Sequence, residues 1–501
     1  MSPDIGHRTS DVGRMKCLII GAGPSGLTSA VLLAEQGWQV TVLEAHAIPG
    51  GLLQRFRRGP YWFDTGFHFI TGGGPGGPFR PLAERLGILD RIQFLPHDLE
   101  RQFRIHLPDG GVVDLPAGIA ECEAACGRYW PEQVDGFTRF FAELRAGLHA
   151  KPWLAMLVAT DTPPPAIDPN LSVSEVLDRC GVSGLAKEVL GCLAGILAMK
   201  PERTPMGLYA TFAGTSIAGS CRAAKGGEAI ITPLVERLKE LGGTLLLNRA
   251  VTNIEFTERE VTAVVDIKGN RHTADLYLAT CHPAEVLRLT GPGGMRPSLE
   301  ERIRDTPDSA SVVLVYAGLS QPPAALGRSH HFARIRGDSD LYYLAPSNFE
   351  EACEHPYLEA MVWVPGDAVA AWRDSKKGKR PEDYEAWKRA WEQEILSAIT
   401  TRHPELAGTI SRVWSSSPLS VADYVHSRNG AAMGLSHDVG HIGTDPLPRR
   451  SRLKNLFFAG QSIGHPGVLG AMIDGFVMAG AIVGKDLANE GSRPAADPEI
   501  S

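Results

Sequence analysis

The chain has 501 residues, of which 43% are hydrophobic and 21% are charged, and its formal net charge is −7. This composition is typical of a folded globular protein with room for two or three hydrophobic cores, and the negative charge argues against a nucleic-acid partner. The eight cysteines form no C-x-x-C pair, which predicts reduced thiols in a cytoplasmic protein and no metal site.

After a leader at residues 1–14, which we expect to be disordered, the segment Lys16–Glu44 reads as strand, glycine turn, helix and strand. Its turn carries the pattern G-x-G-x-x-G at Gly21, Gly23 and Gly26. The first glycine permits a tight turn, the second lets a pyrophosphate approach the backbone, and the third lets the helix pack against the strand.

The helix after this turn is predicted from about Pro24 to Gln36, and its first free N–H groups would face an anion. Glu44 closes the second strand, where a carboxylate can accept hydrogen bonds from both ribose hydroxyls. The same carboxylate would repel a 2′-phosphate. The sequence therefore predicts a dinucleotide site that disfavours NADP.

The middle of the chain contains helices and strands without an internal repeat. Gly59–Ile70 predicts a pair of aromatic strands, and Glu121–His149 and Ser172–Ala198 predict helices. From Cys221 onward a second α/β region follows, with a helix over Ala229–Leu241 and then a strand over Thr244–Asn248.

The chain closes with a strand over Asn455–Gly460 and an apolar helix from about Val468 to Leu487. A nucleotide-binding unit thus opens the chain, and a strand–loop–helix closes it. We therefore predict an α/β fold in which a discontinuous, two-dinucleotide-binding (Rossmann-like) domain carries an inserted α+β substrate domain. The nucleotide domain is assigned to residues 15–85, 221–295 and 445–490, the substrate domain to 86–220 and 296–444, and a tail to 491–501.

Several segments resemble the two-dinucleotide flavoproteins of the amine-oxidase and phytoene-desaturase type. Gly50–Gly51 is similar to their double glycine, Lys225–Ile254 to their middle FAD segment, and Asn455–Gly475 to their C-terminal FAD segment. Phe63–Ile70 and Ser417–Gly440 resemble stretches of the retinol saturases, and carotenoid isomerases share much of this pattern. The resemblance is weak over residues 92–222 and 322–409.

One position departs from this pattern. Many of these enzymes follow the double glycine with arginine, whereas this chain has Leu52 there and its next arginine is Arg55. Arg55 is therefore not assigned the usual role beside the flavin.

The resemblance implies an extended FAD. Its ribose would lie on Glu44, its adenine beside the backbone of Val251, and its ribityl chain near the turn at Gly460. The helix near Gly470 would direct N–H groups toward flavin N1 and O2, and a neutral amide, Gln461, stands where many relatives have an acid. The implied cofactor-binding residues are Gly21, Gly23, Pro24, Ser25, Gly26, Glu44, Ala45, Gly50, Gly51, Leu52, Val251, Gly460, Gln461, Gly470, Ala471 and Met472.

Such enzymes act on carbon–carbon double bonds, and the resemblance implies saturation, desaturation or isomerisation of a lipophilic polyene or isoprenoid, as in carotenoid or polyketide metabolism. This chemistry needs an apolar slot and a proton donor. The candidate donors are His68 and His465, which titrate near neutrality as free side chains, together with Tyr424 and His437. The predicted slot is lined by Trp130, Phe137, Phe140, Phe141, Trp153, Leu193, Ile196, Leu197 and Met199.

Two other functions compete with this one. A flavin amine oxidase would often carry an aromatic cage and a lysine near flavin N5, and the loop Gly464–Gly467 has no aromatic residue. An escort protein of this fold would bind lipid without flavin chemistry, but its nucleotide fingerprint would be degraded. The expected partner is a hydrophobic small molecule. The longest apolar stretch, Val189–Met199, is too short to span a bilayer, which leaves peripheral membrane contact and the oligomeric state open.

Overall fold

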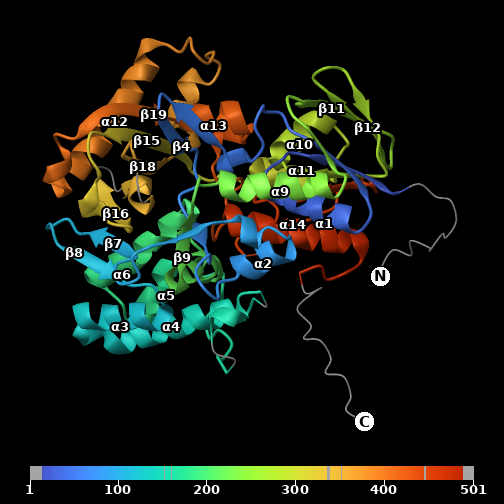
Figure 1. The fold of residues 1–501 in the computed structure, drawn as a ribbon. Coiled ribbons are helices and arrows are strands. Elements are labelled where there is room, and N and C mark those ends of the chain that lie inside the picture. The colour runs from blue at the N-terminus through green and yellow to red at the C-terminus, as the bar shows by residue number, and fades with distance from the viewer. Residues whose placement is uncertain are drawn as a thin grey trace.

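A computed structural model describes residues 14–151, 153–158, 161–335, 339–350, 353–444 and 447–488 (Figure 1). Of the predicted leader only Arg14 belongs to these residues, and the predicted tail at 491–501 lies outside them. No helix within these ranges is long and apolar enough to cross a membrane.

A five-stranded parallel sheet forms the nucleotide-binding part of the molecule. Its order is β10-β2-β1-β14-β20, with strands at Thr244–Leu246, Gln39–Leu43, Lys16–Ile20, Leu276–Ala279 and Leu456–Phe458. Because these strands come from the beginning, middle and end of the chain, three distant segments meet in one sheet. The predicted α/β class is confirmed, while the exact domain boundaries stay a prediction.

Each face of this sheet has its own cover. Helices α1 (Pro24–Glu35), α9 (Glu228–Glu240) and α14 (Gly467–Val483) pack on one face and share a core with Ile19, Val42 and Leu278. The other face packs against an antiparallel sheet, and its core contains Leu18, Ile20 and Leu43. That sheet consists of β11 (Val251–Phe256), β12 (Val261–Asp266) and β13 (Arg271–His272). The alternation along each strand places successive side chains on opposite faces.

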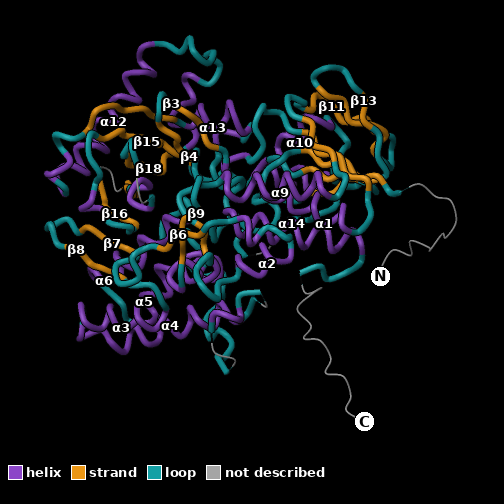
Figure 2. The backbone as a smooth tube through the Cα atoms, in the orientation of Figure 1, coloured by secondary structure: helices purple, strands orange, loops and turns teal. Residues whose placement is uncertain are grey.

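A seven-stranded mixed sheet forms the second part, on the other side of the molecule in Figures 1 and 2. Its order is β19-β15-β18-β17-β16-β7-β8, and only the β16–β7 pair is parallel among its described pairings. The strands cover Ile410–Ser416, Ser311–Leu319, Tyr357–Val364, Ser339–Leu344, His330–Ile335, Phe103–His106 and Val112–Leu115.

The two faces of this sheet are covered differently. Helix α12 (Glu382–Arg402) packs on one face through Ile395 and Ile399. The opposite face contributes Phe332 and Leu344 to a helical core. That core contains α3 (Ile119–Tyr129), α4 (Val134–His149), α5 (Val173–Cys180) and α6 (Gly184–Cys192).

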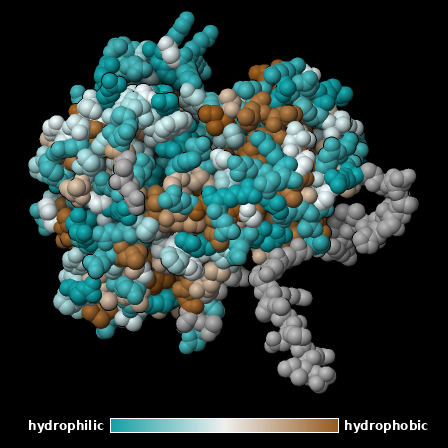
Figure 3. Space-filling view, in the orientation of Figure 1, coloured by the Kyte–Doolittle hydropathy of each residue, from teal (hydrophilic) through white to brown (hydrophobic). Residues whose placement is uncertain are grey.

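Small elements join these parts. The helices are α2 (Phe79–Arg85), α7 (Met206–Tyr209), α8 (Thr215–Ala218), α10 (Pro283–Thr290), α11 (Pro297–Asp305) and α13 (Pro418–Val425). The strands are β3 (Arg55–Arg58), β4 (Tyr61–Asp64), β5 (Ile70–Thr71), β6 (Phe94–Pro96) and β9 (Ser220–Ala223). In Figure 3 the visible face is largely hydrophilic, with hydrophobic side chains in small groups.

The predicted elements differ from the observed ones at three breaks. The aromatic hairpin pairs β3 with β4 around Gly59, whose φ is +58°, and so begins earlier than Gly59–Ile70. The helix predicted over Glu121–His149 ends before Pro131, because proline cannot continue it. The helix over Ser172–Ala198 breaks at Gly181, which adopts the left-handed conformation.

Candidate functional site

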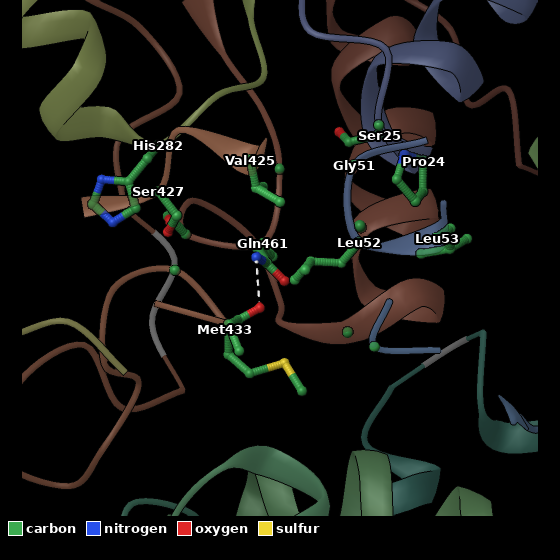
Figure 4. A pocket seen from close by; sticks show the side chains of 18 of the residues that line it. Pro24, Ser25, Gly51, Leu52, Leu53, His282, Val425, Ser427, Met433 and Gln461 are labelled. Atoms are coloured by element: carbon green, nitrogen blue, oxygen red, sulfur yellow. Dashed lines mark hydrogen bonds between the residues drawn. The ribbon is translucent and has the colours of Figure 1, made fainter. Parts of the chain in front are cut away.

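A cavity of about 450 Å³ runs between the two main sheets, which is within the usual size of ligand sites. Gly21, Gly23 and Glu44 line its nucleotide end, and Phe332 and Trp363 line its apolar end. Figure 4 shows some of the residues that line the cavity. Pro24, Ser25, Gly51 and Leu52 lie on one side, and His282, Val425, Ser427, Met433 and Gln461 lie on the other.

The glycine turn fits a pyrophosphate. A Cβ on Gly26 would lie 2.1 Å from the Gly21 carbonyl oxygen, so the third glycine is required by the close approach of helix and strand. A Cβ on Gly23 would meet nothing within 4 Å, so the second glycine leaves open space beside the first turn of α1. Ser25 Oγ is buried there without a hydrogen-bond partner among the described residues. An anion at this helix start would find both space and donors.

The nucleotide end continues at Glu44. Its two carboxylate oxygens accept hydrogen bonds from the backbone N–H groups of Ala22 and His46, each at 2.8 Å, which fixes the carboxylate at the cavity wall. Arg249 also lines the cavity, and one guanidinium nitrogen is buried without a described partner. Arg249 was not among the predicted site residues, although it lies within the segment that resembles the middle FAD segment.

The chain has Leu52, and not the usual arginine, directly after the double glycine, and the structure shows where Leu52 and Arg55 lie. Gly51 and Leu52 line the cavity, at the start of the short 3₁₀ helix Gly51–Leu53. Arg55 instead lies 3.7 Å from the Asp64 carboxylate and 5.7 Å from the centre of the Trp62 ring. Its guanidinium is thus held outside the cavity lining.

The C-terminal segment forms the wall opposite Leu52. The N–H of Gly460 donates to the Asp474 carboxylate at 2.6 Å, which fastens the turn after β20 to helix α14. The Gln461 side-chain amide donates to the Ala432 carbonyl at 3.1 Å (dashed line in Figure 4). The His437 ring lies 3.0 Å from the Gln461 carbonyl oxygen, so the Gln461 backbone is fixed as well.

Thirteen of the implied cofactor residues line the cavity, and Gly50, Gly470 and Met472 do not. The Cβ direction of Gly50 is filled by Ile231 at 3.1 Å, and that of Gly470 by the His465 carbonyl oxygen at 2.5 Å. Met472 is fully buried in the core beneath the five-stranded sheet. These three residues therefore pack behind the residues that line the cavity.

The strongest catalytic candidate is His68, on the loop between β4 and β5. Its side chain lines the cavity and is 5% exposed, and its Nδ1 lies 3.2 Å from Oε2 of Glu359. Nε2 of His68 is buried and has no hydrogen-bond partner among the described residues. Glu359 is fully buried on β18. A carboxylate on Nδ1 fixes the ring, which leaves Nε2 for a ligand.

A second buried ion pair holds this loop in place. Arg222 donates to the Asp64 carboxylate and to the His68 carbonyl oxygen, both at 2.8 Å. The N–H of Asp64 donates to Glu359 at 3.1 Å. Asp64 is therefore a positioning residue, and Glu359 and Arg222 were not predicted. Glu359 is the one charged residue in the strand sequence YLEAMVWV, which is a usable sign of a buried functional group.

The other predicted proton donors lie elsewhere. The His465 side chain does not line the cavity, and its ring lies 6.2 Å from that of Trp153. Burial lowers the pKa of His465 to about 3. Tyr424 lines the cavity, but its ring lies 5.4 Å from His46, near Glu44 at the nucleotide end. Neither position favours proton transfer beside His68.

The apolar end is formed mainly by the seven-stranded sheet rather than by the predicted aromatic helices. Of the predicted slot residues only Ile196 and Leu197 line the cavity, while Phe137, Phe140 and Phe141 are buried in the helical core. The observed lining at this end includes Phe67, Phe69, Phe212, Val312, Leu314, Phe332, Tyr342, Met361 and Trp363.

Phe212 lies on a π-helical turn, Ala210–Gly214, between α7 and α8. Such turns recur at functional sites. A Cβ on Gly467 would lie 3.6 Å from the Phe212 ring, so this ring stands beside the first turn of α14. The indole N–H of Trp363 donates to the Gly195 carbonyl at 2.7 Å and joins the sheet to the helical layer at the cavity wall.

Comparison with known proteins agrees with this arrangement. The family model described as flavin containing amine oxidoreductase matches residues 24–483. The all-trans-retinol 13,14-reductase of Rattus norvegicus is 22% identical over 95% of this chain and 87% of its own length. The all-trans-zeta-carotene desaturase of Myxococcus xanthus is 33% identical over 26% of this chain and 24% of its own. The crystal structure of an oxidoreductase from Methanosarcina mazei has a TM-score of 0.68 at 14% identity, covering 93% of this chain and 99% of that one, and shares the fold.

Proposed function

The chain belongs to the flavin containing amine oxidoreductase family, and we propose that it is an FAD-dependent oxidoreductase acting on carbon–carbon double bonds of a lipophilic polyene. The resemblance to the retinol saturase and carotenoid desaturase group is confirmed by the relatives described above. The observation that carries the proposal is one continuous cavity, from an anion-binding glycine turn to an apolar end that holds a buried histidine–carboxylate pair.

The residues at the nucleotide end would hold FAD. Ser25 and the first turn of α1 would bind the pyrophosphate, and Glu44 would accept hydrogen bonds from the ribose. The first turn of α14, which lines the cavity at Gly467–Leu469, would offer its N–H groups to the flavin ring. When bound, FAD supplies hydride exchange with substrate carbon.

His68 would handle the proton that accompanies a hydride. Saturation of a double bond needs a proton at the second carbon, and desaturation needs a base there. Glu359 stabilises the charged ring, and the unpartnered Nε2 would exchange the proton with substrate. Asp64 and Arg222 would hold the loop that carries His68 in a fixed conformation.

The apolar end would select the substrate. Phe212, Phe332 and Trp363 offer aromatic surface to a conjugated chain and exclude water from the site. A lipophilic substrate of this kind partitions into membranes, so the proposal includes that the protein takes up its substrate from a membrane surface.

The direction of the reaction follows from a mass measurement. FAD-reconstituted protein is reduced anaerobically and incubated with all-trans-retinol and with carotenoid polyenes, and products are analysed by mass spectrometry. A gain of two mass units indicates saturation, and an unchanged mass with altered retention indicates isomerisation. Oxidised protein incubated with the same polyenes gives a loss of two for desaturation. The FAD-free protein is the control, and bleaching of the oxidised flavin by primary amines without any polyene product would contradict the proposal.

A further inference from the structure

Three buried histidines meet on the face of the seven-stranded sheet that points away from the cavity. His106 ends β7, His331 lies on β16, and His403 follows α12. Tyr343 on β17 stands opposite His331 in the cross-strand register. Side chains alternate along a strand, so Phe332 and Tyr342 line the cavity while His331 and Tyr343 face the α12 side.

Their geometry is that of a closed metal site. The ring centres of His106, His331 and His403 form a nearly equilateral triangle with sides of 5.3, 5.4 and 5.4 Å. Zinc binds imidazole nitrogen at about 2.0–2.1 Å, and tetrahedral bonding then separates ring centres by about 5 Å. One nitrogen from each ring lies within 4.8 Å of the others.

A fourth ligand atom completes the set. The Tyr343 hydroxyl oxygen lies 3.0 Å from Nε2 of His106 and 3.0 Å from Nε2 of His403. Nε2 of His106 also lies 3.0 Å from Nδ1 of His331. Adjacent ligand atoms in a tetrahedral zinc site are separated by about 3.3 Å, so these three pairs already lie close to the separation that an ion requires.

The outward nitrogens of His331 and His403 have partners of the kind found in metal sites. Nε2 of His331 lies 2.9 Å from the Leu326 carbonyl oxygen, which can only accept, so the lone pair of His331 is on the inward Nδ1. Nδ1 of His403 lies 3.5 Å from the Glu405 carboxylate. Carbonyl and carboxylate partners of this kind orient metal-binding imidazoles.

Burial and neighbouring charge keep the three rings neutral. Burial lowers the pKa of His106 to about 3, and it lowers the pKa values of His331 and His403. Arg104 and Arg402 act in the same direction on His106 and His403, and Glu405 opposes them at His403. Neutral imidazoles are the form that binds metals.

The two arginines also oppose a divalent cation. Arg104 is paired with Asp114 at 2.8 Å, and Arg402 donates to the carbonyl oxygens of Ala398 and Arg334. Both arginines would reduce the affinity for a divalent ion without removing a ligand.

We propose that His106, His331, His403 and Tyr343 form a structural Zn²⁺ site that fastens the end of α12 to strands β7, β16 and β17. All four side chains are at least nine-tenths buried, so the four ligands close the coordination sphere and leave no position for a substrate. The site would therefore stabilise the seven-stranded sheet from behind the cavity. It departs from the sequence-based expectation of no metal site, since the four residues come from three distant segments.

Metal analysis of the FAD-loaded full chain tests this site. The protein is incubated with zinc sulfate, separated from free metal by gel filtration and analysed by mass spectrometry of the elements. We expect about one zinc per chain, and less than about 0.2 in His331→Gln and His403→Gln. The matched control is His97→Gln, which changes a buried histidine outside the cluster and should keep the metal. Flavin absorbance reports whether each variant is folded.

A second measurement needs no variant. Metal-free wild-type protein is titrated with Co²⁺, and we expect the intense visible absorption of tetrahedral cobalt, saturating at one equivalent, with an increase in thermal stability. Absence of bound zinc together with absence of this absorption would show that the cluster is a metal-free hydrogen-bonded network. Equal zinc in the wild type and both cluster variants would place the metal elsewhere on the surface. Either result overturns the proposal.

Discussion

Replacing Glu359 by glutamine isolates the charge that supports His68. The two side chains have nearly the same shape, and an amide oxygen can still accept a hydrogen bond from Nδ1 of His68. The substitution removes the negative charge 3.2 Å from the ring, and it also removes one of the two acceptor oxygens, because the second carboxylate oxygen accepts from the N–H of Asp64. If His68 carries a positive charge during turnover, this charge is what the glutamate stabilises.

The size of the effect follows from the distance and the burial. Two unit charges about 4 Å apart attract by about 4 kcal/mol at an effective dielectric constant of about 20. The retained hydrogen bond recovers part of this energy. We expect a loss of about 2–4 kcal/mol in transition-state stabilisation, which corresponds to a fall in turnover of about 30- to 1000-fold.

Stopped-flow measurement of flavin reoxidation by a polyene under anaerobic conditions gives this rate. FAD affinity and KM should change little, because Glu359 contacts the loop and not the nucleotide end. Glu385→Gln, on the outer helix α12, is the matched charge-removal control. His68→Gln should be at least as slow as Glu359→Gln. Turnover within threefold of wild type in both variants would refute proton transfer through this pair.

Three further outcomes are expected. Glu44→Ala should weaken FAD retention in gel filtration, because the carboxylate proposed to bind the ribose is lost, and full flavin occupancy would contradict this assignment. Gly23→Ala should fold normally and bind FAD poorly, since its Cβ would enter the open cavity. Gly26→Ala should lower the free energy of unfolding by about 1–3 kcal/mol, because its Cβ would clash with the Gly21 carbonyl oxygen. Equal thermal stability of the two variants would contradict this packing argument. Burial lowers the pKa of His437 to about 4, so between pH 6.5 and 4 the unfolded chain binds a proton that the folded chain does not. As the pH is lowered through that window, the free energy of unfolding should therefore decrease by up to about 1.4 kcal/mol per pH unit. His437→Gln should reduce this slope in thermal unfolding.

The nucleotide half of the molecule could be read from the sequence because its determinants are local. Gly21, Gly23 and Gly26 are needed where a strand turns sharply into a helix, and both the turn and the glycines lie within a few residues. The strand Lys16–Ile20 and the start of α1 at Pro24 lie at the predicted positions. The family resemblance then extended this reading to FAD and to the type of reaction.

The apolar end depended on contacts that no local pattern encodes. An aromatic residue in a helix is equally suited to a core or a cavity, and Phe140 and Phe141 are in the core. His68 was a candidate from its loop, but its carboxylate partner is 291 residues away and meets it only when β18 packs beside that loop. His465 was likewise a candidate from its loop, but its ring packs near Trp153 and does not line the cavity.

The sequence by itself therefore determined the dinucleotide turn, the α/β class and the family, since each is visible in short motifs whose own residues lie close together in the chain. Only the tertiary structure decided which side chains face the cavity and which charges pair across it. The His68–Glu359 pair and the cluster of His106, His331 and His403 arise where distant strands and helix ends are brought together. Such juxtapositions follow from sheet order and register, which local propensity does not specify.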